Sequence, residues 1–260
     1  MQFSLSEEEY LIQDTARKLA EDKIAPLAET LDRGDGREAF LANLKMLAEN
    51  GYMGLNVSAD HGGTEAGTVA FALAVEEIGR ACAATGVTVS VSNMVAEVIQ
   101  AVGSNEQRAA YLPKLTDGTY SAGAFCLTEA GAGSDPSAMK TRAVLDGNHY
   151  VLNGTKLYIT SAEYAGVFVV WAVTDPDAPK GKGITCFLVE AGTPGLVIGK
   201  AEKKMGQTGS ATNEVVFQDC RVPASAVMGK ENDGFRIAVG ELAGGRIGIA
   251  ALALGIARAA

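Results

Sequence analysis

The stretch CLTEAGAGSD, residues 126–135, lies where the character of this 260-residue sequence changes. Before it, apolar residues recur at the spacing of amphipathic helices, and after it short alternating segments typical of β-strands follow one another. Gly131 and Gly133 make a turn rich in backbone N–H groups, with the hydroxyl groups of Thr128 and Ser134 beside it. Such a turn can bind an anion or the edge of a heterocycle. It can equally be a bulge or a hairpin turn.

The residues before this stretch predict a series of helices. Ser6 and Glu9 form a capping-box pattern at the first helix, and Ser104 and Gln107 repeat it at a later one. A glycine at the end of a periodic segment is typical of a helix C-terminus. On these signals further helices are expected over 38–50, over 68–84 and in the segment that ends at Gly103.

The residues after it predict strands. Asp146-Gly147-Asn148 and Asn153-Gly154 are typical of tight turns between strands. Strands that follow one another without intervening helices favour an antiparallel sheet or barrel over a Rossmann fold. The expected strands cover 120–128, 140–146, 149–152, 155–160, 166–173, 184–190 and 214–218.

The pattern becomes helical again from about residue 233 and stays so to Ala260, without a terminating signal. Because its apolar face has no later segment to pack against, we expect the sequence to be cut short or completed by another subunit. The expected fold is α+β and multidomain. It comprises an N-terminal helical domain (1–118), a central antiparallel β-barrel (119–228) and the first helix of a truncated C-terminal helical domain (229–260).

Composition and charge exclude several classes of protein. A formal net charge of −9 and the lack of a basic cluster argue against nucleic-acid binding. The four cysteines and two histidines lack the spacing of a metal or disulfide site, so we expect reduced packing cysteines and no metal. The apolar run 247–257 is about half the length of a membrane span, and no cleavable leader follows Met1. We therefore expect no membrane span and a cytoplasmic location.

Three further motifs follow along the chain. In NGTKLYITSA (153–162), Tyr158 and Thr160 lie on the opposite strand face from Ile159, where they could contact a planar cofactor or simply be half-buried sheet residues. The glycine-rich stretch KKMGQTGSATNEVVFQDCRVP (203–223) reads as a long loop before a strand. GGRIGIAALALGIARAA (244–260) carries a single arginine that is either ion-paired or directed at an anionic ligand. Rossmann and P-loop signatures are both incomplete.

The order of these four motifs, after a helical region, resembles the acyl-CoA dehydrogenase family, and its short-chain, butyryl-CoA-like branch in particular. The resemblance covers nearly the whole sequence. It implies a helical domain, a β-barrel and a C-terminal four-helix bundle, of which most would be missing here. It also implies FAD as cofactor, an acyl-CoA substrate, an electron-transfer flavoprotein as partner and a homotetramer.

The resemblance also implies roles for individual residues. The cofactor would be bound by Phe125, Leu127, Thr128, Gly133, Ser134, Tyr158, Ile159 and Thr160. The CoA substrate would be bound by Ser134, Lys182 and Arg246. Two positions depart from the family pattern, because Ala130 stands where a proline is common and Ala243 where an aspartate is common. The second departure removes one hydrogen bond to CoA.

No catalytic residue is assigned in this chain. In the family a glutamate removes the α-proton of the thioester while the β-hydrogen leaves as a hydride to the flavin. In most members that glutamate lies in the segment absent here, and in a minority it directly precedes the helix arginine, where this sequence has Gly245. Glu241 is more than one turn away from Arg246, and we do not assign it as the base.

The resulting functional hypothesis is an FAD-dependent acyl-CoA dehydrogenase that forms a trans-2-enoyl-CoA and passes electrons to an electron-transfer flavoprotein. One alternative is a non-catalytic or half-site subunit that completes the flavin site of a partner. Another is an acyl-CoA oxidase of the same fold. The sequence does not decide the acyl group.

Overall fold

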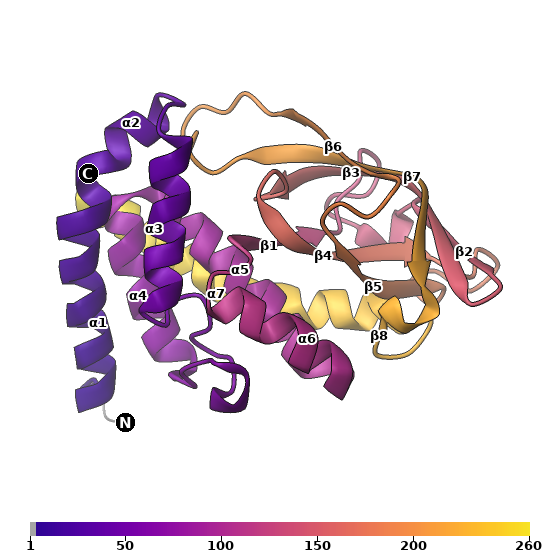
Figure 1. Cartoon of the computed structure of the whole chain (residues 1–260), viewed down its shortest axis with the longest axis horizontal. Helices are drawn as coiled ribbons and strands as arrows, with labels where there is room; N and C mark the ends of the chain where they lie inside the picture. Colours follow the sequence, from indigo (N-terminus) through magenta and orange to yellow (C-terminus); the bar gives the residue numbers. More distant parts are fainter. Residues whose placement is uncertain (1–3) are drawn as a thin grey trace.

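The computed structural model describes residues 4–260, so the start at Met1, where no leader is expected, lies outside the described residues. The helices come first and gather at one end of the molecule (Figure 1). The predicted capping boxes at Ser6 and Ser104 are both confirmed. The helices are α1 (Glu7–Leu19), α2 (Ala28–Asp32), α3 (Arg37–Glu49), α4 (Gly67–Ala81), α5 (Ala83–Val102) and α6 (Asn105–Thr116).

The strands form one eight-stranded sheet in the order β6-β7-β3-β2-β4-β5-β8, with β1 beside β4. The ladders are antiparallel except for β1–β4 and a single residue pair between β2 and β4. The central sheet is therefore mixed rather than purely antiparallel. The chain forms β2 and β3 between β1 and β4, and β4 then pairs in parallel with β1. The strands are β1 (Ala122–Cys126), β2 (Arg142–Asp146), β3 (His149–Thr160), β4 (Ala165–Val173), β5 (Ile184–Glu190), β6 (Leu196–Ala201), β7 (Thr212–Pro223) and β8 (Val227–Met228).

Strand β4 is buried on both faces. Its residues Phe168 and Val170 point into a core enclosed by the curved sheet. The alternate residues Val169 and Trp171 point into a second core shared with α5, α6 and α7. The period-two alternation of a strand thus lets β4 join the sheet to the helices. All four cysteines are buried and unpaired, which confirms the prediction of packing residues.

Residues 149–160 form one strand, and the predicted turn at Asn153-Gly154 is wrong. The ladder with β7 shifts register at Gly154, which marks a β-bulge. A Cβ atom at Gly154, whose φ is 151°, would lie 2.7 Å from Thr141 Cα, so the glycine allows two backbones to approach closely. Strands β6 and β8 were not predicted.

The last helix, α7 (Gly234–Ala259), runs from the sheet back to the N-terminal helices (Figure 1). Cβ atoms at Gly248 and Gly255 would overlap Ser90 on α5 and the backbone of Glu76 on α4, so glycines allow the close packing. Within residues 4–260, α7 is the one helix long and apolar enough to cross a membrane, a test that buried core helices also pass. The absence of a membrane span therefore stays a prediction.

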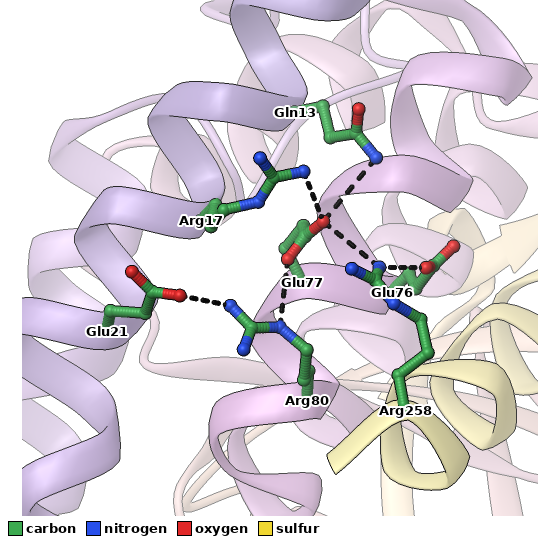
Figure 2. A network of polar contacts seen from close by, with 7 residues as sticks. All are labelled: Gln13, Arg17, Glu21, Glu76, Glu77, Arg80 and Arg258. Carbon is green, nitrogen blue, oxygen red and sulfur yellow. Dashed lines mark hydrogen bonds and ion pairs between the residues drawn. The ribbon is translucent and has the colours of Figure 1, made fainter.

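A charged cluster joins three helices at the end opposite the sheet (Figure 2). Glu77 on α4 has no exposed side-chain surface, and its carboxylate accepts hydrogen bonds from Arg17 on α1, Arg80 on α4 and Arg258 on α7, at 3.0–3.1 Å. Glu76 binds Arg258 and Glu21 binds Arg80 around the rim. We call these residues the Glu77 network, and they fix the C-terminal turn of α7 against α1 and α4.

Candidate functional site

The two motifs assigned to the cofactor lie against each other. The amide N of Leu157, in β3, donates a 2.9 Å hydrogen bond to the carbonyl O of Thr128, just beyond β1. This bond places CLTEAGAGSD alongside NGTKLYITSA, although β2 separates them in the sequence. Residues that the resemblance assigns to one ligand therefore occupy one region of the sheet.

The end of β3 presents polar side chains outward. Tyr158 is 63% exposed, whereas its neighbour Ile159 is 2% exposed and lies in the enclosed core. The predicted alternation of faces is thus confirmed at this strand end. Tyr158 has a φ of 59° and Ser161 a φ of 68°, a strained region for residues other than glycine. The Ser161 hydroxyl is buried without a hydrogen-bond partner among the described residues.

Three of the residues assigned to the cofactor have buried or packed side chains. The ring of Phe125 lies against Trp171, with 4.3 Å between ring centroids. Leu127 is 5% exposed and belongs to the core shared with the helices, and Ile159 points into the enclosed core. Leu127 and Ile159 can therefore reach a ligand only through their backbone, whereas the half-buried ring of Phe125 keeps part of its surface exposed. Thr128 and Thr160 are half-buried and have side chains at the surface of the region.

The loop 129–141 carries the remaining assigned residues, Gly133 and Ser134, at an exposed position. A Cβ atom at Gly133 would meet nothing within 4 Å, so the backbone there is open to a ligand. The exposed Lys180 binds Asp135 at 2.6 Å and holds the loop that carries Lys182 against this one. The two residues assigned to CoA in this part of the chain, Ser134 and Lys182, therefore lie on adjoining loops.

Arg246 lies apart from these loops, in an apolar pocket between α5 and α7. The pocket has a volume of about 300 Å³ and includes Ser90, Met94, Leu242 and Gly245. Arg246 is exposed and has no ion pair within residues 4–260. The absence of an acidic partner favours the second reading of the sequence, a guanidinium available to an anionic ligand.

Helix α5 connects the pocket with the sheet. The Ser92 hydroxyl accepts a 3.3 Å hydrogen bond from the amide N of Gly123 in β1, while the preceding residues Ser90 and Val91 line the pocket. Met94, one turn further on, fills the space beside Gly245. A Cβ atom at Gly245 would lie 2.6 Å from Met94 Sδ, so a glutamate there could not be placed without moving Met94.

Two half-buried carboxyl groups lie near the pocket. Burial and the nearby carboxyl of Glu97 raise the pKa of Glu241 to about 7. Burial also raises the pKa of Glu97, although Asn56 donates a 2.8 Å hydrogen bond to its carboxylate. Neither carboxyl lines the pocket. Between residues 4 and 260, no three His, Cys, Asp or Glu side chains gather closely enough to bind a metal ion.

The sequence reasoning missed a buried ion pair inside the site. Lys156 Nζ lies 2.8 Å from Glu129 Oε1, and the lysine side chain has no exposed surface. Glu129 belongs to the first motif and Lys156 to the second. A signal was present in the sequence, because Lys156, four positions after buried Leu152, falls on the same face of a strand that continues through the bulge at Gly154. That bulge was taken for a turn.

The helical region and the sheet each match a known family model. Residues 6–119 match the acyl-CoA dehydrogenase N-terminal domain, and residues 124–220 match the acyl-CoA dehydrogenase middle domain. This chain belongs to the acyl-CoA dehydrogenase family. The family predicted from the order of four motifs is therefore confirmed.

Two curated proteins are similar to this chain over its full length. An acryloyl-CoA reductase (NADH) of Anaerotignum propionicum is 46% identical, over 100% of this chain and 66% of that protein. A short-chain specific acyl-CoA dehydrogenase of Clostridium acetobutylicum is 43% identical, over 100% of this chain and 68% of its own. The present chain thus spans about two thirds of the length of these two relatives.

Solved structures share the fold of this family member. Butyryl-CoA dehydrogenase from Megasphaera elsdenii matches with a TM-score of 0.93 and 38% identity, over 100% of this chain and 68% of that one. A chain in a structure of the electron-transferring flavoprotein of Acidaminococcus fermentans matches with a TM-score of 0.95 and 41% identity, over 100% and 67%. An acyl-CoA dehydrogenase of Bacillus anthracis complexed with FAD matches with a TM-score of 0.90 and 32% identity, over 97% of this chain and 42% of that one. The expected helical domain, central sheet and final helix are confirmed.

Proposed function

We propose that this chain forms the flavin and acyl-CoA site of an FAD-dependent acyl-CoA dehydrogenase that converts an acyl-CoA thioester to a trans-2-enoyl-CoA. The observation that carries the proposal is the hydrogen bond between Leu157 and Thr128, which brings the two cofactor motifs together. The FAD bound by a Bacillus anthracis relative supports the choice of cofactor.

The residues of this region suit a flavin. The half-buried hydroxyls of Thr128 and Thr160 and the exposed backbone at Gly133 and Ser134 offer the donors and acceptors that a heterocycle edge requires. The exposed ring of Tyr158 offers a surface for stacking. Bound FAD would supply the acceptor for a hydride, and this chain would bind and orient it.

The pocket between α5 and α7 suits a short acyl chain. Its lining is almost entirely apolar, and Met94 narrows it beside Gly245. Arg246 at its edge has no acidic partner among the described residues and would attract the anionic CoA moiety. Short-chain relatives in Clostridium acetobutylicum and Megasphaera elsdenii support this choice of substrate.

The proton acceptor is proposed to lie outside this chain. The carboxylate must approach the substrate α-carbon in a site with little water, where its pKa is raised and the thioester oxygen is stabilised. The lining of the pocket contains no carboxylate, and position 245 is a glycine with Met94 Sδ beside it. The remaining third of the relatives' length is the proposed source of the base.

Partners, assembly and location are part of the same proposal. An electron-transfer flavoprotein is the proposed electron acceptor, with the match to a chain in the Acidaminococcus fermentans structure as support. The homotetramer, the cytoplasmic location and the domain limits at residues 118 and 228 stay predictions.

The test uses this chain alone and joined to the C-terminal third of the Clostridium acetobutylicum relative. We expect the joined protein to bind FAD and its flavin absorbance to bleach when butyryl-CoA is added without air. The chain alone should show no bleaching even when FAD is bound. A flavin-loaded joined protein that no acyl-CoA bleaches would contradict the proposal, and fast reoxidation by air would indicate an oxidase instead.

A further inference from the structure

The Lys156 side chain is a buried cation inside the sheet. Its Nζ atom lies 3.1 Å from Leu127 O, 2.8 Å from Glu129 Oε1 and 3.8 Å from Met139 Sδ. These three acceptors match the three N–H bonds of an ammonium group. A fully buried lysine is rare in proteins unless it is paired.

Glu129 completes the pair and closes a loop. Its Oε2 accepts a 2.6 Å hydrogen bond from the amide N of Lys140, and its Oε1 accepts one of 3.0 Å from Thr141. Burial acts to raise the pKa of Glu129, but Lys156 and these N–H donors hold it below its usual range. Glu129 therefore joins the two ends of the loop 129–141 as a carboxylate.

The pair lies between the two groups of residues assigned to the flavin. Glu129 closes the base of the loop that carries Gly133 and Ser134, and Lys156 lies two residues before Tyr158 in β3. Among residues 4–260, no other ion pair joins this loop to β3. The backbone of Tyr158, two residues after Lys156, is strained, and strain of this kind persists only where the surroundings enforce it.

A buried ion pair is a poor source of stability. Removing two charges from water costs about as much as their attraction returns, and apolar side chains of similar size often stabilise a core as well or better. The value of this pair must therefore lie in geometry. An ammonium with three acceptors and a carboxylate with three donors each define one arrangement of the segments around them, whereas apolar contacts tolerate sliding.

We propose that Lys156 and Glu129 are positioning residues that hold the loop 129–141 and the end of β3 in the relative arrangement that binds the flavin. This inference rests on the proposed function, because the flavin is the ligand that the arrangement serves. It adds two residues to the site, neither of which needs to touch the cofactor.

The test compares single and double substitutions in the joined protein described above. Lys156→Met and Glu129→Gln each leave one buried charge without its partner, so both lower the urea midpoint of unfolding. The double variant K156M/E129Q removes both charges and should regain part of that midpoint, because the glutamine amide accepts a hydrogen bond at only one of the two former carboxylate oxygen positions. We expect its dissociation constant for FAD, measured by flavin fluorescence, to stay raised about tenfold or more, the loss expected for a misplaced hydrogen-bonding group.

Two further variants serve as controls for the positioning role. Glu129→Asp keeps the charge but shortens the side chain, so it should weaken FAD binding while lowering the urea midpoint less than Glu129→Gln does. Arg221→Gln removes an exposed ion pair with Asp146 in the same sheet and should change neither quantity. If the double variant regains FAD affinity together with stability, or if Glu129→Asp binds FAD like the parent, the positioning role is wrong.

A flavin-free measurement separates this inference from the proposed function. Amide hydrogen exchange at Lys140, Thr141 and Leu157 should be faster in K156M/E129Q than in the parent, while exchange in α4 and α5 stays the same. If the parent binds no FAD, the proposed function fails. If exchange at these three amides is unchanged, the inference fails whether or not FAD binds.

Discussion

Glu77 is the residue with the largest number of charged partners in the described part of the chain. We predict that Glu77→Gln lowers the free energy of unfolding by about 3–5 kcal/mol, because it leaves arginines from three helices around a buried neutral group. Urea denaturation at neutral pH measures the loss. The control is Glu29→Gln, which removes an exposed pair with Arg33 and should cost less than about 1 kcal/mol. Equal losses in the two variants would contradict the prediction.

The same residue predicts a loss of stability in acid. Burial acts to raise the pKa of Glu77, but the three arginines hold it below its ordinary value of 4.5. A depressed carboxyl pKa stabilises the fold above the unfolded-state pKa, and this contribution disappears as the pH falls through the folded-state pKa. The difference in unfolding free energy between the parent and Glu77→Gln should therefore shrink as the pH is lowered from 4.5. A constant difference down to about pH 2 would count against it.

The raised pKa of Glu241 predicts the opposite pH dependence of stability. Its pKa is raised from 4.5 to about 7 by burial and by Glu97. A raised carboxyl pKa means that stability is lost as the pH rises from the unfolded-state value through the folded-state value. Glu241→Gln should be more stable than the parent by about 1–2 kcal/mol at pH 8, after allowance for partial solvent exposure, and equal to it at pH 4.

Thermal unfolding at these two pH values measures the effect of Glu241. The control is Glu202→Gln, an exposed position without an ion pair among the described residues, where a change in unfolding free energy within about 0.5 kcal/mol is expected. Glu97→Gln should reproduce part of the gain, because it removes the repulsion on Glu241. A destabilised Glu241→Gln at pH 8 would show that the carboxylate has a favourable partner instead.

Single residues also mark the limit of the sequence reasoning. Ser6, Ser104 and the exposed Tyr158 were placed correctly, because caps and strand alternation depend on neighbours in the sequence. Lys156 and Glu129 were missed, because a charged residue is expected at the surface until a partner from another strand is known. That partner lies 27 positions away and is brought close only by the fold.

At the scale of the element, the glycines of α7 have two different roles. Gly240 is exposed and a Cβ atom there would meet nothing within 4 Å, whereas a Cβ atom at Gly255 would overlap the backbone of Glu76. Gly240→Ala should therefore stabilise the chain by about 0.5–1 kcal/mol through helix propensity. Gly255→Ala should destabilise it by about 1–3 kcal/mol because α4 and α7 must separate.

Melting temperatures of the two alanine variants measure this contrast within one helix. A third variant, Gly248→Ala, should resemble Gly255→Ala, since a Cβ atom at Gly248 would overlap Ser90 on α5. Stabilisation by alanine at 255 would mean that α7 does not pack on α4 in this way.

The strands show what a one-dimensional pattern omits. The segments 166–173 and 184–190 were predicted almost to the residue, because both are long and apolar. The short, half-exposed β6 was missed, because its apolar run 196–198 does not alternate with polar residues and ends at Gly199. The parallel pairing of β1 with β4 was also missed, because strand order depends on the path of the chain between strands.

At the scale of the whole molecule, the helices and the sheet share a core. Residues from α5, α6, α7, β1, β4 and β5 contribute to one hydrophobic cluster. Through Arg258, the Glu77 network binds the C-terminal end of α7 to α1 and α4. The N-terminal end of α7 lies on the sheet. Helix α7 is thus the element that links the two ends, and the candidate pocket with Arg246 lies along it.

This shared core predicts that the molecule unfolds in one transition. Trp171 is the only tryptophan and is 0% exposed, and its Nε1 donates a 2.8 Å hydrogen bond to Gly234 O at the start of α7. Its fluorescence therefore reports the junction of sheet and helix, while far-ultraviolet circular dichroism reports mainly the helices. In urea the two signals should change together.

The coupling can be tested from the far end of the molecule. Leu252 on α7 is 4% exposed and lies in the core of the N-terminal helices, a different cluster from that of Trp171. Leu252→Ala should destabilise the fold by about 2–5 kcal/mol. If the chain is one cooperative unit, the variant moves the fluorescence curve and the circular dichroism curve by the same amount. A shift of the circular dichroism curve alone would show that the helices unfold independently, and that α7 does not transmit stability to the site.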